Sequence, residues 1–162
     1  RAFFGGTLRF TGATRENTHS LAHANVARLH RLVDALGMPV SVEPVVVVEH
    51  ELRAIARMSQ GAPLELHFRW EDGAERRTEF VLEFRQETLM QLDRTVMVGG
   101  VPVDLPAVDG LFATDQRLAT AEMVDGALPY VTQERILGVL GIADALAGTQ
   151  PWRLSGAVPK ET

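Results

Sequence analysis

Residues Leu64–Phe84 read LELHFRWEDGAERRTEFVLEF, and this stretch decides the fold class. Apolar and polar residues alternate on both sides of a turn, which is typical of two strands with one buried face and one solvated face. We expect a hairpin with a five-residue loop over residues 72–76, because an odd loop length keeps the apolar residues of both strands on one face. This register sets Leu66 opposite Leu82.

Two helices flank this region. Apolar residues recur at helical spacing over Thr18–Leu36, and Gly37 follows as the stop signal. A second helix begins after Thr132, a residue suited to the N-cap, and ends at Gly148.

Shorter segments read as strands. Residues 2–10 predict a strand with a bulge or a close backbone approach at Gly5 and Gly6. Residues 45–48 read as a strand buried on both faces. Residues 50–58 are open to either interpretation, and a short helix fits them slightly better.

A second hairpin is predicted over Thr95–Leu105, with a two-residue turn at residues 99–100. In this register Pro102 faces Met97 in a non-hydrogen-bonded pair. Because proline cannot donate to a further neighbour, Val101–Leu105 is expected to be an edge strand open to a partner. The candidate partner-binding edge consists of Val101, Val103 and Leu105.

These elements predict an α+β fold. An antiparallel sheet of about four to six strands packs on the long N-terminal helix and the C-terminal helix. Residues 1–148 form a single α+β domain, and residues 149–162 form a C-terminal tail.

The composition fits one soluble domain and excludes several classes of protein. The chain has 162 residues, of which 46% are hydrophobic and 23% charged, with no cysteine. Without cysteine it has no disulfide, thiol catalysis or thiolate metal site. No apolar run approaches the roughly 20 residues that a membrane span requires. A net charge of -5 counts against a nucleic-acid partner. The expected compartment is the cytoplasm, although a cysteine-free chain fits the periplasm equally well, and the arginine-rich balance is typical of a GC-rich bacterial genome.

Common catalytic motifs are absent from the sequence. It contains no phosphate-binding G-x-x-x-x-G-K-[ST] loop, no dinucleotide-binding G-x-G-x-x-G and no G-x-S-x-G nucleophile elbow. The His50-Glu51 pair lacks the second histidine of a zinc protease. No cofactor follows from the sequence.

A stripe of histidines runs along the predicted N-terminal helix. His19 and His23 are four residues apart, as are His30 and Asp34, so all four share one side of a regular helix. Spacing of four suits a chelating pair, which makes His19 and His23 candidate metal ligands. The alternative is a polar boundary of an amphipathic helix.

The solvated face of the first hairpin is the second candidate site. Its acids, bases and guanidiniums suit an anionic ligand or acid–base chemistry, although a solvated charged face has the same composition. The candidate ligand-binding residues are His67, Arg69, Glu79 and Glu83.

The missing motifs and the open edge favour a non-catalytic interaction module that binds a protein partner or forms a homodimer. The alternative is a small-molecule-binding protein or an enzyme, metal-dependent in one version. It would use the polar hairpin face or the His19/His23 stripe.

Overall fold

The computed structural model describes residues 2–13, 20–92, 95–104, 117–118, 120–121, 123–124, 126 and 131–154. Its strands are β1 (Phe3–Gly12), β2 (Ser41–Val48), β3 (Glu51–Arg57), β4 (Pro63–Trp70), β5 (Arg77–Phe84), β6 (Thr88–Leu92), β7 (Thr95–Val98), β8 (Val101–Val103) and β9 (Trp152–Arg153). Its helices are α1 (Leu21–Ala24), α2 (Val26–Leu36) and α4 (Gln133–Ala147).

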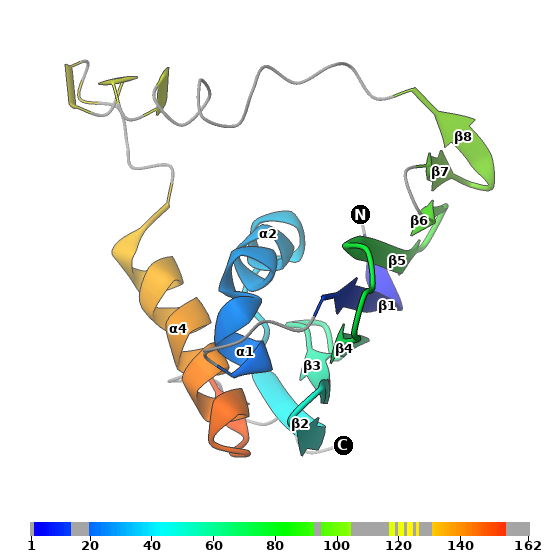
Figure 1. Ribbon diagram of the computed structural model, residues 1–162. Helices are drawn as coiled ribbons and strands as arrows, with labels where there is room; N and C mark the ends of the chain where they lie inside the picture. The colour runs from blue at the N-terminus through cyan, green and yellow to red at the C-terminus, as the bar shows by residue number, and fades with distance from the viewer. Residues whose placement is uncertain are drawn as a thin grey trace.

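These strands form one mixed sheet in the order β8-β7-β6-β5-β1-β4-β3-β2-β9 (Figure 1). Only the β1–β4 pair is parallel among the described strands. The α+β class is therefore confirmed. The expected four to six strands are too few, because the described residues alone form nine.

The first predicted hairpin is wrong in its pairing. Strands β4 and β5 alternate as expected, but β1 lies between them, parallel to β4 and antiparallel to β5. Leu8 of β1 stands between Leu66 and Phe80, so Leu66 does not face Leu82. Alternation identifies the buried face of a strand but not its neighbour, which explains the error.

Glycines allow β1 to enter the sheet. A side chain at Gly6 would collide with the carbonyl oxygen of Val81 and approach the Leu82 Cα within 3.1 Å. The pairing with β5 shifts between Phe3 and Gly5, which is the predicted bulge. The close approach and the bulge are both confirmed.

The N-terminal helix is interrupted. Instead of one helix over Thr18–Leu36, α1 and α2 meet at Asn25, a buried residue outside both helices. Its Nδ2 donates to the carbonyl of Leu21 at 2.8 Å, and its Oδ1 accepts from Arg28 Nη1 at 3.1 Å. A buried amide satisfied in this way stabilises the break. The predicted end at Gly37 is confirmed.

The helices cover one face of the sheet. Helix α1 packs on β3 and β4, and α4 packs on β2. In Figure 1 strands β6–β8 extend away from the helices. The C-terminal helix is confirmed with its Thr132 N-cap. Two glycines of α4 give it close contacts, since a side chain would meet Met38 at Gly138 and Trp152 at Gly141. In the described part of the chain, no helix is long and apolar enough to cross a bilayer.

The second hairpin is confirmed where the structure describes it. Met97 pairs with Pro102, and β8 lies at the end of the sheet. Residue Leu105 lies outside the described residues. Residues 51–57, by contrast, form strand β3 and not a helix, because three buried residues, Leu52, Ala54 and Ala56, alternate along it. Strand β2 is not buried on both faces, since Val45 and Val48 are exposed.

Strand β9 is a short strand at the edge of the sheet and follows α4 in the sequence. Trp152 pairs with Val42, and its ring packs against the hydrophobic core. The division into a domain at residues 1–148 and a tail at 149–162 stays a prediction.

We predict that Gly6→Ala lowers the unfolding free energy by about 1–3 kcal/mol, because the two atoms that the methyl group meets most closely belong to the backbone of β5. Urea denaturation measures the loss. Thr7→Val, on the next residue of β1, is the control and should change stability by about 0.5 kcal/mol or less. Equal stability of the two variants would contradict the close-approach argument.

Candidate functional site

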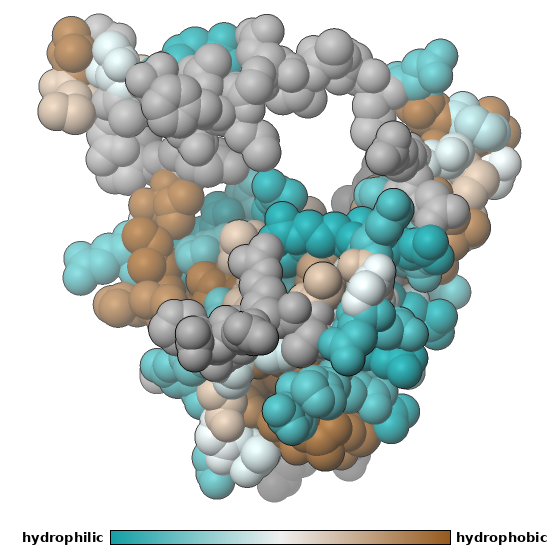
Figure 2. Space-filling model, viewed as in Figure 1, coloured by the Kyte–Doolittle hydropathy of each residue, from teal (hydrophilic) through white to brown (hydrophobic). Residues whose placement is uncertain are grey.

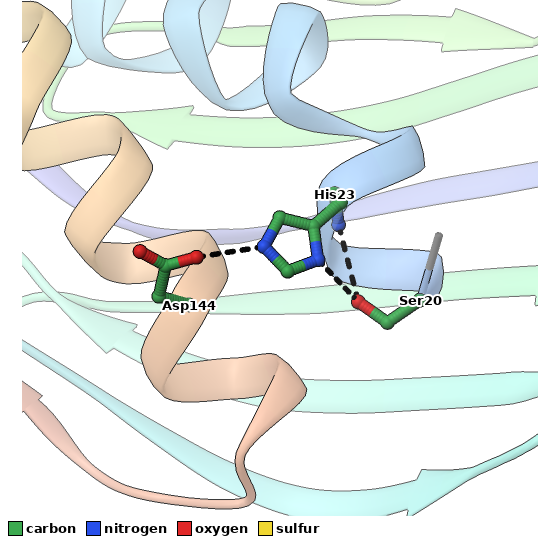
Figure 3. Close-up of polar contacts among 3 residues, drawn as sticks. All are labelled: Ser20, His23 and Asp144. Carbon is green, nitrogen blue, oxygen red and sulfur yellow. Dashed lines mark hydrogen bonds and ion pairs between the residues drawn. The ribbon is translucent and has the colours of Figure 1, made fainter. Parts of the chain in front are cut away.

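A polar cluster joins α1 to α4 on the helical side of the sheet. The Ser20 Oγ lies 2.9 Å from His23 Nδ1, and His23 Nε2 lies 2.7 Å from Asp144 Oδ1 (Figure 3). The three residues form one hydrogen-bonded chain from a hydroxyl through an imidazole to a carboxylate. The cluster joins segments 121 residues apart in sequence.

This arrangement orients the imidazole. A carboxylate can only accept, so His23 Nε2 donates to Asp144 and Nδ1 of the neutral ring accepts from the Ser20 hydroxyl. The His23 side chain is 34% exposed and so remains accessible to solvent. A half-buried histidine fixed by a carboxylate is a typical general base or acid.

Local structure explains how the residues meet. Ser20 is the N-cap of α1, where its Oγ also accepts from the His23 backbone N–H at 3.4 Å. The break at Asn25 interrupts the stripe expected of a regular helix. His23 therefore faces α4 through Asp144, while Asp34 and His30 contact Arg135, nearer the start of α4.

The metal hypothesis stays a prediction, because His19 lies outside the described residues. Within the part of the chain that the structure describes, no three histidine or acidic side chains are placed to hold a metal ion. Both ring nitrogens of His23 already have protein partners.

A second polar contact between α2 and α4 contains buried atoms without partners. Arg135 Nη1 donates to Asp34 Oδ1 at 2.7 Å, and Nη2 donates to the backbone carbonyl of His30 at 3.0 Å. His30 Nδ1 and Arg135 Nε are buried and form no hydrogen bond with the described residues. Desolvation and the nearby Arg135 charge lower the pKa of His30 below its usual 6.5.

The opposite face of the sheet is open and holds a groove of about 540 Å³ across β1, β4 and β3. Of the predicted hairpin residues, His67, Arg69 and Glu79 line this groove, whereas Glu83 does not. The polar residues of the lining are Thr7, Arg9, Thr11, Arg53, Glu65, His67, Arg69 and Glu79.

One acid contacts two bases beside the groove. Glu51 Oε1 lies 2.9 Å from His67 Nε2 and 3.2 Å from Arg53 Nε. Sequence reasoning missed Arg53, because a short helix fits residues 50–58 slightly better than a strand. It also missed Arg9, although the alternation of Leu8 and Phe10 with polar residues in β1 carries the signal.

The predicted partner edge is exposed where it is described. Val101 and Val103 of β8 are 65% and 41% exposed. The role of this edge in binding a partner stays a prediction.

Ser20 and Asp144 were also missed. Apart from being a residue type that suits a helix N-cap, Ser20 gives no signal in the sequence. Asp144 is a single acid in the apolar run of α4, and only the packing of α4 against α1 gives it a histidine partner.

The fold resembles that of solved oxidoreductases. The match to an oxidoreductase from Thermotoga maritima covers 94% of this chain and 54% of the oxidoreductase, with a TM-score of 0.75 and 11% sequence identity. The match to UDP-N-acetylglucosamine 3-dehydrogenase from Acidithiobacillus ferrooxidans covers 92% of this chain and 54% of the dehydrogenase, with a TM-score of 0.76 and 14% sequence identity. Biliverdin reductase from Synechocystis was solved with biliverdin and NADP+. The match covers 91% of this chain and 55% of the reductase, with a TM-score of 0.71 and 17% sequence identity. No family profile and no curated protein sequence matches the chain.

The shared architecture is a mixed, mostly antiparallel sheet with helices packed on it. At these identities the similarity shows the fold. The chain spans about half the length of the solved structures that it matches.

This similarity corrects the main functional interpretation. The non-catalytic interaction module was inferred from missing motifs, and it is wrong, because proteins that share the fold over more than nine-tenths of this chain are oxidoreductases. The alternative, a small-molecule-binding protein or enzyme, agrees better with the comparison. The missing motifs misled because the fold is shared at 11–17% identity, where no sequence motif marks it.

We predict that Asp144→Ala changes the tautomer of the neutral His23 ring. In the wild type at pH 8.5, the carboxylate keeps the hydrogen on Nε2. Without it, both tautomers should be populated, as seen in the ¹⁵N chemical shifts of the ring nitrogens. The His50 ring is the internal control and should not change. An unchanged His23 tautomer would contradict the oriented pair.

We predict that stability falls as the pH drops below about 6.5, because the pKa of His30 is lowered in the folded state and the unfolded chain binds the proton more tightly. His30 contributes its full stability above its unfolded pKa and loses it on acidification. Urea denaturation at pH 7.5 and pH 5.0 measures this loss. His30→Gln should show a smaller loss than the wild type, and equal losses would exclude His30 as the cause.

Proposed function

We propose that this chain is the substrate-binding domain of an NAD(P)-dependent oxidoreductase. The observation that carries the proposal is the match of more than nine-tenths of the chain to about half of each of several oxidoreductases. A domain that matches half of an enzyme performs part of its work. The hydrogen-bonded His23 supports an acid–base role for this domain in the enzyme.

The residues present do not fit the dinucleotide itself. The sequence has no G-x-G-x-x-G after a strand, and the described sheet is mostly antiparallel, unlike the parallel sheet of dinucleotide-binding folds. We therefore assign the cofactor to a separate dinucleotide-binding domain and derive no hydride step on this chain.

The chemistry left to this chain is proton transfer and binding. A substrate hydroxyl that is oxidised must lose its proton, and His23 Nδ1 is the acceptor, since Nε2 already donates to Asp144. The Ser20 hydroxyl lies on Nδ1 at 2.9 Å. Ser20 therefore either relays the proton or is displaced by the substrate hydroxyl.

An uncovered apolar surface lies beside this cluster. Figure 2 shows a hydrophobic patch over α4, where Ile136, Leu137 and Leu140 are 39%, 59% and 40% exposed. Leu140 precedes Asp144 by four residues and so lies on the same side of the helix. A dinucleotide-binding domain docked on this surface would enclose His23 between two domains, which supports the proposed division of work.

A second copy of the chain remains a predicted partner. The predicted contact is the exposed edge at Val101 and Val103 of β8.

We predict that the chain binds a substrate of such enzymes without binding the cofactor. The probes are UDP-N-acetylglucosamine and biliverdin, which the names of two proteins of similar fold supply. At about ten times its Kd, one of them should raise the unfolding free energy by about 1.4 kcal/mol and Tm by about 3–6 °C. Differential scanning fluorimetry measures the shift.

Two variants locate the binding. His23→Gln should lose the shift, whereas His50→Gln should keep it, because His50 is also beside an acid but lies on a turn away from α4. Tight binding of NADH to the chain alone, seen as enhanced cofactor fluorescence, would overturn the assignment to a substrate domain. So would the absence of a shift with both probes.

A further inference from the structure

We propose that the groove on the open face of the sheet is a second binding site, for a small hydroxycarboxylate with two or more acidic groups. It lies on the opposite face of the sheet from His23, and the proposed oxidoreductase function does not require it. Its volume of about 540 Å³ falls within the usual range for small-molecule sites, roughly 300–1,000 Å³.

Strand register gathers positive charge at the centre of the groove. His67 of β4 pairs with Arg9 of β1 on one side and with Arg53 of β3 on the other. Arg69 follows two residues later on the same face of β4. Neighbouring strands are about 4.8 Å apart, so the Arg9 and Arg53 positions are separated by roughly 10 Å, with the imidazole between them. Three guanidiniums thus line the same groove in a protein of net charge -5.

Two of the guanidiniums have no partner among the residues that the structure describes. Glu51 contacts His67 and Arg53, and it is the only acid with an ion pair to this group among the described residues. Arg9 and Arg69 form neither a hydrogen bond nor an ion pair within the described part of the molecule. A guanidinium is built to bind a carboxylate with two parallel hydrogen bonds, so this pair suits a ligand with two acidic groups.

The remaining lining restricts the ligand further. Glu65 and Glu79 also line the groove, and they can only accept hydrogen bonds. Glu79 stands opposite Arg9 on β5 without forming an ion pair with it in the described structure. A ligand hydroxyl can donate to these carboxylates while its acidic groups bind the arginines, which favours a hydroxycarboxylate over a simple anion.

Isothermal titration calorimetry of the full chain with citrate tests the proposal at low ionic strength. The expected result is one site per chain with a Kd below about 1 mM. Tricarballylate, which is citrate without the hydroxyl, should bind about threefold more weakly or worse. Equal binding of the two anions would overturn the role given to Glu65 and Glu79.

Matched arginine variants locate the site. Arg9→Gln/Arg69→Gln should weaken citrate binding about tenfold or more. Arg57→Gln is the control, because Arg57 lies on β3 outside the groove lining, and it should bind as the wild type does. Circular dichroism and the urea midpoint confirm that each variant is folded, and the single variant Arg69→Gln replaces the double variant if that one unfolds.

The two proposed sites can be separated. His23→Gln should keep citrate binding, whereas the groove variants should keep any response that depends on His23. Unchanged citrate affinity in the groove variants, or no heat of binding with 10 mM citrate, would overturn the second site and leave the proposed oxidoreductase function untouched.

Discussion

The position of β1 between β4 and β5 is the constraint on which the rest of the structure depends. The strand enters a space where Gly6 meets the backbone of β5 too closely for any side chain. By pairing on both sides, β1 joins the half of the sheet that carries the helices to the half that extends away from them. It also aligns the apolar residues of three strands in one layer, with Leu8 between Leu66 and Phe80.

The same strand gives the sheet two chemically different faces. Its apolar residues continue the core under the helices, whereas Arg9 and its polar neighbours complete the open groove. Each of the two candidate sites therefore belongs to one face, and the sheet separates them. A groove built on paired strands is rigid, because hydrogen bonds on both sides fix each backbone position. The helical site depends instead on how α1 and α4 pack together.

That packing turns an ordinary helix cap into a candidate catalytic group. Asn25 ends α1 after one turn, and its buried amide satisfies the carbonyl of Leu21 at the break. The short helix places His23 against Asp144, and the N-cap hydroxyl of Ser20 occupies the other ring nitrogen. In the function that we propose, this chain binds the substrate and a separate domain binds the dinucleotide. An oriented imidazole on a surface flanked by exposed apolar residues of α4 is consistent with that division.

The sequence by itself determined the elements and their buried faces. Alternation marked β4 and β5, the two-glycine turn marked β7 and β8, helical spacing and caps marked α2 and α4, and the Gly5-Gly6 pair marked the close approach. These signals are local, so each can be read from neighbouring residues. It also indicated His67, Arg69 and Glu79 as one polar face, and all three line the groove. The tertiary structure alone decided which strands pair, that β1 separates the predicted hairpin, and that Asp144 meets His23 across 121 residues. Those contacts depend on long-range packing, for which a single sequence carries no periodic signal.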